Sequence, residues 1–179
     1  AAQMLMEYAE LEARYLNRVD KAIAILTEVV ANPVVDARTK AQAKIDLADY
    51  YLIDGERWES TLLYSQVDKD FMEDQMGELA RYKNARLSYF GGDFEWAQEQ
   101  FDILKRATSR LISNDAIDMS VFILDHLNQD STGEALSDYA AAELALFQNR
   151  FVSALVILDS MSVWYPENSL KDDIFYLQA

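Results

Sequence analysis

The sequence predicts an all-α protein, and three observations lead to this prediction. The chain has 179 residues but only 5 glycines and 2 prolines, far fewer than the turns of a β-sandwich or β-barrel require. Apolar residues make up 51% and charged residues 26%, which is typical of a folded domain with a buried core. Apolar side chains also recur at the three- and four-residue spacings of helices that are buried on one side.

The predicted helices follow one another with short connections and without a linker between domains. Their expected ranges are 2–16, 19–32, 37–54, 57–69, 75–90, 94–109, 114–128, 134–148, 151–163 and a last helix from about 168 to 179. The last helix stops inside its periodic pattern, and the chain begins without methionine. We therefore expect one domain over residues 1–179 with a truncated final helix, cut from a longer protein.

Four segments of the chain share one frame of residue types. A glycine or asparagine is followed five residues later by a small residue, and nine and twelve residues later by apolar ones. The four sets are Asn17, Ala22, Leu26, Val29; Gly55, Ser60, Tyr64, Val67; Gly92, Ala97, Phe101, Leu104; and Asn149, Ala154, Leu158, Met161. Small residues also stand seven positions before the turn, at Ala48, Ala85 and Ala142.

Each position of the frame has a physical reason. Glycine and asparagine tolerate the left-handed backbone that ends a helix, and a small residue lets two helices approach closely. The frame therefore predicts a helix, a short turn and a second helix. "SYFGGDFEWAQ", residues 88–98, is on this interpretation a corner between helices; a phosphate-binding loop would need a preceding strand and a nearby lysine.

These hairpins resemble the tetratricopeptide repeat (TPR) family. The best copy, "ALSDYAAAELALFQNRFVSALVILDSMSVWYPEN", has Ala142, Ala145, Phe151, Ala154, Leu158 and a proline, Pro166, after its second helix. The third copy has Ala85, Gly92, Phe94, Ala97 and Phe101, the second Ala48, Tyr51, Gly55, Tyr64 and Val67, and the first Ala13, Ala22, Leu26, Val29 and Pro33. The resemblance implies a right-handed α-solenoid with repeats at about 3–34, 41–74, 78–111 and 135–168.

The chain departs from a regular repeat in one place. The small residues of the second helices are 38, 37 and then 57 residues apart, so the segment at about 112–132 is additional. Ser113 or Asn114 is a candidate helix cap there, and Ile117, Val121, Ile123, Leu124 and Leu127 form an apolar helical face. We expect one extra helix near 114–128.

Composition and motifs argue against several functions. The chain has 16 basic and 31 acidic residues, a net charge of −15, which disfavours nucleic acid and anionic membranes as partners. It has no cysteine and no apolar run long enough to cross a membrane. His126 is the only histidine, and we expect it at a helix end; the run from Asp68 to Asp74 lacks the glycine and glutamate of a calcium loop. We predict neither an enzyme nor a site for a metal or cofactor.

Protein binding remains, and the resemblance implies that it uses the first helix of each hairpin. The corresponding positions are Ile45, Asp49, Leu52, Tyr82, Arg86, Tyr89, Tyr139, Glu143 and Leu146. Tyr82, Arg86 and Tyr89 are spaced to form one patch, whose residue types are common at interfaces; alternatively, the two tyrosines pack between neighbouring hairpins with their hydroxyls in water. We predict partner binding through Tyr82, Arg86, Tyr89, Tyr139, Glu143 and Asp49.

The predicted function is therefore a scaffold that binds a protein or peptide, and two alternatives remain. One is a structural module that associates weakly with itself through uncapped ends, and the other is a helical accessory domain of a larger protein. TPR-like repeats that clamp the C-terminal carboxylates of heat-shock chaperones carry Lys and Asn at these positions, whereas Asp49 and Glu143 would repel a carboxylate. The degenerate repeats resemble bacterial ones, and both the cell envelope or periplasm and the cytoplasm stay open.

Overall fold

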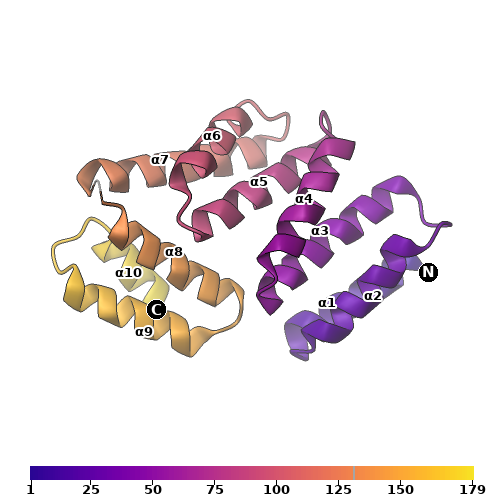
Figure 1. The fold of residues 1–179 in the computed structure, drawn as a ribbon, viewed down its shortest axis with the longest axis horizontal. Helices are drawn as coiled ribbons and strands as arrows, with labels where there is room; N and C mark the ends of the chain where they lie inside the picture. The colour runs from indigo at the N-terminus through magenta and orange to yellow at the C-terminus, as the bar shows by residue number, and fades with distance from the viewer. Residues whose placement is uncertain (131) are drawn as a thin grey trace. The chain divides into compact units, whose positions relative to one another are not determined.

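The computed structural model describes residues 1–130 and 132–179, and throughout this part of the chain the secondary structure is helical (Figure 1). The elements are α1 Ala2–Glu10, the short π-helix η1 Leu11–Tyr15, α2 Val19–Ala31, α3 Ala37–Asp54, α4 Arg57–Asp70, α5 Gln75–Phe90, α6 Phe94–Leu104, α7 Arg110–Gln129, α8 Glu134–Phe147, α9 Phe151–Trp164 and α10 Lys171–Gln178. The all-α prediction is confirmed.

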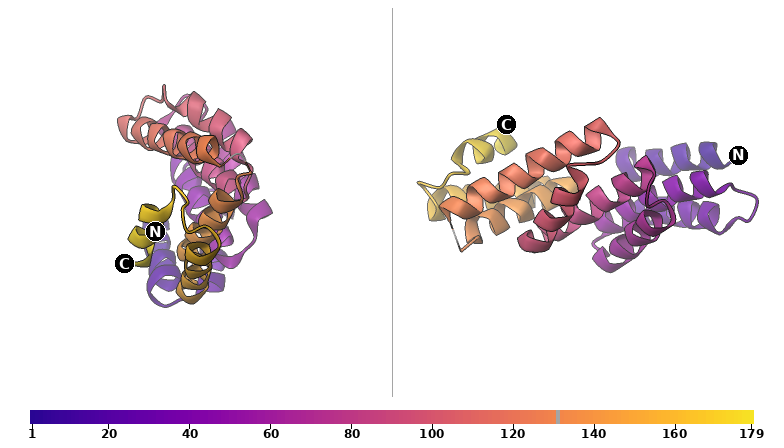
Figure 2. Two further views of the ribbon diagram at one scale, coloured as in Figure 1. Left: turned by 90° about the vertical axis from the view of Figure 1, so that its left-hand side faces the viewer. Right: turned by 90° about the horizontal axis from the view of Figure 1, so that it is seen from above.

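The chain divides into two compact units, and their boundary falls within α5. The first unit is Ala1–Asn84 and the second is Ala85–Ala179. In the first unit α2 packs against both α1 and α3, and α3 packs against α4. In the second unit α6 packs against α7, and α9 packs against α8 and α10; these neighbours can be followed by colour in the further views of Figure 2.

All four predicted corners have the left-handed backbone that the frame requires. The φ angles are 52° at Asn17, 98° at Gly55, 78° at Gly92 and 59° at Asn149. At three corners the next backbone N–H donates to a carbonyl five residues earlier: Glu56 to Tyr51 at 2.8 Å, Asp93 to Ser88 at 3.0 Å and Arg150 to Ala145 at 2.8 Å. This is the hydrogen bond of a Schellman cap. The interpretation of Gly91–Gly92 as a corner is confirmed, and Asp93 caps α6 by accepting from the Trp96 N–H.

The first corner reaches the same geometry with one extra residue. Here the Arg18 N–H donates to the Glu12 carbonyl, six residues earlier, at 2.8 Å. The extra residue is accommodated because Leu11–Tyr15 form a π-helix, which has a wider turn than an α-helix. Ala9, fully buried eight residues before Asn17, therefore takes the place that Ala48 holds seven residues before Gly55.

The second helices bury their frame residues as predicted. All twelve small and apolar frame residues of α2, α4, α6 and α9 are at most 2% exposed. Between α3 and α4 the Ser60 hydroxyl donates to the Ala48 carbonyl at 2.7 Å, so a side chain of one helix touches the backbone of the other. This contact needs a small residue at both positions.

The extra helix exists, but its predicted start is wrong, and of its predicted apolar face only Ile123 is fully buried. α7 begins at Arg110, and its cap is Ser109, which accepts from the Ile112 N–H, in place of Ser113 or Asn114. α6 ends at Leu104 and not near 109. The residues that α7 buries are Ile112, Ala116, Ser120 and Ile123, whereas Ile117, Val121 and Leu124 are exposed and Leu127 is half-buried. The reason is close packing: the Ser120 hydroxyl bonds to the Asp102 carboxylate and the Gln98 amide of α6, so α7 turns its small residues inward.

Candidate functional site

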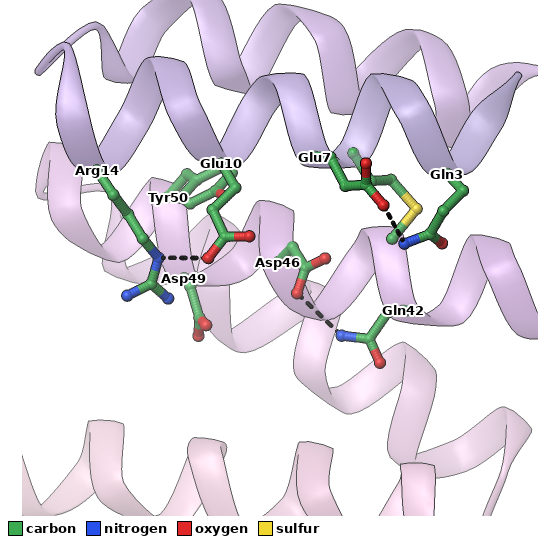
Figure 3. Close-up of a pocket in the computed structure, with 9 residues that line it drawn as sticks. Gln3, Glu7, Glu10, Arg14, Gln42, Asp46, Asp49 and Tyr50 are labelled. Carbon is green, nitrogen blue, oxygen red and sulfur yellow. Dashed lines mark hydrogen bonds and ion pairs between the residues drawn. The ribbon is translucent and has the colours of Figure 1, made fainter.

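A polar pocket of about 280 Å³ lies in the first unit, between the first helices of the first two hairpins. Gln3, Met6, Glu7 and Glu10 of α1, with Arg14 of η1, form one wall, and Gln42, Asp46, Asp49 and Tyr50 of α3 form the other. Figure 3 shows the α1 and η1 side chains extending toward those of α3. The pocket therefore joins equivalent faces of two successive hairpins.

The two walls of the pocket carry the same short pattern. Gln3, Glu7 and Glu10 have the spacing i, i+4, i+7, and Gln42, Asp46 and Asp49 repeat it 39 residues later. In both walls the glutamine amide donates to the first acid, at 3.3 Å for Gln3 and 2.9 Å for Gln42. The corners Asn17 and Gly55 are only 38 residues apart, and the extra residue in η1 accounts for the difference of one.

The pocket is electrostatically negative. It has four carboxylates, and the only cation in its lining is Arg14, which pairs with Glu10 at 3.3 Å. Burial raises the pKa of Asp46, and the neighbouring charges of Asp49 and Glu10 raise it further. Burial and the charge of Asp46 also raise the pKa of the Tyr50 hydroxyl to about 12. A cation placed here would stabilise the ionised form of Asp46.

Asp49, one of the predicted binding residues, lies at the margin of this pocket and is held from the other side. Its carboxylate accepts a hydrogen bond from the Tyr64 hydroxyl of α4 and pairs with the ammonium group of Lys83, on α5, at 2.8 Å. Asp49 is 8% exposed, so most of its charge is neutralised within the protein. Tyr82 also belongs to the first unit; it is half-buried on α5 and does not line the pocket.

The other four predicted residues gather in the second unit. The Tyr89 hydroxyl donates to the Glu143 carboxylate at 2.7 Å, and the ring of Phe122 from α7 lies 6.5 Å from that of Tyr89 and 5.6 Å from that of Tyr139. The Arg86 guanidinium lies over the Phe90 ring, 5.1 Å from its centre, and its buried Nε has no hydrogen-bond acceptor among the residues that the structure describes.

Most of the cluster formed by Arg86, Tyr89, Tyr139 and Glu143 is buried. Tyr89 is 0% exposed and Tyr139 is 5% exposed, so both are part of the core. Burial raises the pKa of both hydroxyls and that of the Glu143 carboxyl. Of the patch Tyr82, Arg86 and Tyr89, only Tyr82 and Arg86 retain exposed surface. Tyr89 is therefore a packing residue, as in the alternative in which the tyrosines pack between hairpins, although its hydroxyl is hydrogen-bonded to Glu143 rather than to water.

His126 lies in the last turn of α7, near the helix end that was predicted for it. Its ring meets that of Phe122 edge to face, with centroids 4.4 Å apart, and its Nδ1 is 2.6 Å from the Ser169 hydroxyl. Its Nε2 is 3.8 Å from the Asp173 carboxylate of α10. Burial lowers the pKa of His126, and the nearby acids only partly offset this effect.

Sequence reasoning missed most of the pocket, although a signal was present. Gln3, Glu7, Glu10, Asp46 and Tyr50 were not among the predicted site residues. The repeated glutamine–acid–acid spacing identifies Gln3, Glu7, Glu10 and Asp46, but only when a shift of 39 residues is compared beside the shift of 38 between the corners; Tyr50 lies outside this pattern.

No protein-family model matches the chain, and no curated protein sequence does either. In the part of the chain that the structure describes, no helix combines the length and the apolar character needed to cross a membrane. The function has to be argued from the geometry of the hairpins and the pocket.

Proposed function

We propose that this chain is a non-enzymatic scaffold of TPR-like hairpins, arranged as a right-handed α-solenoid, that binds a basic segment of a partner protein. Two repeated features support the repeat assignment: the left-handed corners at Asn17, Gly55, Gly92 and Asn149, and the buried frame residues of the four second helices. Neighbouring hairpins of this kind bury their faces against each other and leave an extended surface for a partner.

The observation that carries the binding proposal is the position of the pocket. It lies on the first helices, α1 and α3, of two successive hairpins in one unit. In arrays of helical hairpins these helices line the surface that takes extended peptides. The predicted residue Asp49 belongs to this surface, and the pocket adds Glu7, Glu10 and Asp46 to it.

The charge of the pocket selects the kind of partner. An ammonium or guanidinium group entering between Glu7 and Asp46 would exchange its water shell for carboxylates that have few cations of their own. Gln3 and Gln42 add amide donors and acceptors that suit a peptide backbone. A lysine- or arginine-containing segment therefore fits better than an acidic one.

A displayed peptide library tests this proposal with a defined readout. The wild-type chain is expected to enrich peptides with lysine or arginine, and the double variant Glu7→Gln/Asp46→Asn should bind them about tenfold or more weakly, a loss of about 1.4 kcal/mol. The control is Glu59→Gln/Glu73→Gln, which removes the same charge from exposed positions outside the pocket. Enrichment of peptides without basic residues, or equal weakening by both double variants, would refute the pocket as the binding site.

A further inference from the structure

The outward face of α9 differs from the same face of the other second helices. Three positions define this face: two residues before, two after and nine after the small frame residue. They are occupied by Asp20, Ala24 and Ala31 in the first copy, by Trp58, Leu62 and Lys69 in the second, and by Glu95, Glu99 and Arg106 in the third. In α9 they are Val152, Val156 and Val163, which are 77%, 60% and 76% exposed. Each earlier copy has at least one charged residue at these positions, whereas α9 has three exposed valines.

This face continues on both sides and has little charge. Phe151, Leu155 and Trp164 are also exposed, and Asp159 is the only charged residue of α9. The Asp159 carboxylate accepts from the Gln178 amide of α10 at 2.9 Å. We call the six residues Phe151, Val152, Leu155, Val156, Val163 and Trp164 the α9 patch. Asp159 lies on the same helical stripe, between Leu155 and Val156 on one side and Val163 on the other, so the patch surrounds one exposed carboxylate. Exposed apolar surface of this extent indicates an interface.

We propose that a second copy of this chain covers the α9 patch, so that two copies pair through their α9 helices. The exposed fractions of the six residues correspond to roughly 700 Å² of surface, close to the ~800 Å² that each partner contributes to a standard interface. The proposed binding of a basic segment uses the pocket of α1 and α3 in the first unit, whereas the α9 patch belongs to the second unit. The two surfaces can therefore be tested separately.

The spacing within α9 suits a two-fold axis. The centre of Phe151–Trp164 falls between Ile157 and Leu158, and Val152 and Val163 are equally distant from it. An antiparallel pair about this centre places Val152 of one copy beside Val163 of the other and Phe151 beside Trp164, while Val156 faces Asp159. The ends of the patch therefore have the self-complementarity that a two-fold interface requires. The net charge of −15 on each copy opposes pairing, and salt screens this repulsion.

Sedimentation velocity on the wild-type chain at about 1 to 100 µM tests the pairing, because the fraction of paired chains rises with protein concentration. The expected result is a mass that rises toward twice that of one chain and rises further in high salt. Val152→Glu/Val156→Glu should remain monomeric throughout. Trp58→Glu/Leu62→Glu, which changes the equivalent exposed positions of α4, should still dimerise. A wild-type monomer at 100 µM and high salt, or dissociation of both variants alike, would overturn the proposal.

The absence of native cysteine allows a test of the register. A mixture of the Val152→Cys and Val163→Cys chains is expected to form a disulfide between the two chains under mild oxidation, because an antiparallel pair brings these positions together. Either variant alone should cross-link several-fold more slowly, since the same position in two copies lies at opposite ends of the interface. Equal cross-linking in all three samples would exclude the antiparallel register.

Discussion

Replacing Tyr89 with phenylalanine is expected to destabilise the second unit, because it removes one hydrogen bond and leaves the core shape almost unchanged. The Tyr89 side chain is fully buried, and its hydroxyl donates to Glu143 Oε2 at 2.7 Å. A hydrogen bond to a charged acceptor contributes about 1.5–3 kcal/mol, and the carboxylate oxygen left behind would remain largely desolvated. We expect the free energy of unfolding to fall by about 2 kcal/mol at neutral pH.

The cost of Tyr89→Phe should depend on pH. Burial raises the pKa of Glu143 above its unfolded value, whereas the Tyr89 hydrogen bond lowers it. Between the pKa of Glu143 in the unfolded state and its higher pKa in the folded state, the folded protein retains a proton that the unfolded protein has released. Over this pH interval the free energy of unfolding falls as pH rises. Without the Tyr89 hydroxyl the pKa of Glu143 rises further and this interval widens. The loss should therefore be smaller at acidic pH, where protonation of Glu143 removes the charge of the acceptor, and larger at pH 8.

Urea unfolding in a Trp58→Phe background measures this loss in the second unit alone. The two remaining tryptophans, Trp96 and Trp164, both belong to that unit, so their fluorescence reports its unfolding. Glu143→Gln is the matched control, because glutamine still accepts from the Tyr89 hydroxyl but does not titrate. A loss below about 0.5 kcal/mol at pH 7, or an equal loss at pH 4.5 and pH 8, would refute the reasoning.

Three further predictions concern the corners, a helix crossing and the histidine. Gly92→Ala, at a φ of 78°, should cost about 1 kcal/mol in urea unfolding, and Asn149→Gly, at 59°, should increase stability slightly. Ser60→Ala should cost about 1 kcal/mol, but Ser60→Val about 1–3 kcal/mol, because α4 cannot then approach Ala48; equal losses would contradict the crossing geometry. In an NMR titration the only histidine, His126, should have a pKa below 6.5, so stability falls as pH drops through that value. Asp173→Asn should lower the pKa further; a normal pKa would contradict the burial of His126.

The hairpins could be predicted from the sequence because their rules are local. Glycine and asparagine are the residues that most readily adopt positive φ, and the residue five positions later has to be small where helices cross, so Asn17, Gly55, Gly92 and Asn149 defined the frame. The frame residues of the second helices were predicted correctly because their periodicity is interrupted in none of the four copies.

The errors arose where packing, and not periodicity, selects the buried side. On α7 the apolar residues Ile117, Val121 and Leu124 suggested one face, but Ala116 and Ser120 give a closer approach to α6 and are buried instead. In the first hairpin the π-helix shifts every upstream position by one residue. An insertion of this kind has no residue signature of its own, so the 38-residue frame of the corners does not align Glu7 with Asp46, and the pocket in the structure does.

Charge would link the binding of a basic segment to the pairing of two chains. Each copy has a net charge of −15, which opposes the pairing of two α9 patches over distances comparable to the screening length. A basic segment bound at Glu7 and Asp46 would lower that charge and so reduce the repulsion between copies. Binding and pairing would therefore be positively linked at low salt, and the same reciprocity requires the paired chain to bind the basic segment more tightly. Because this linkage is electrostatic, added salt should weaken it while leaving the apolar contact of the α9 helices intact.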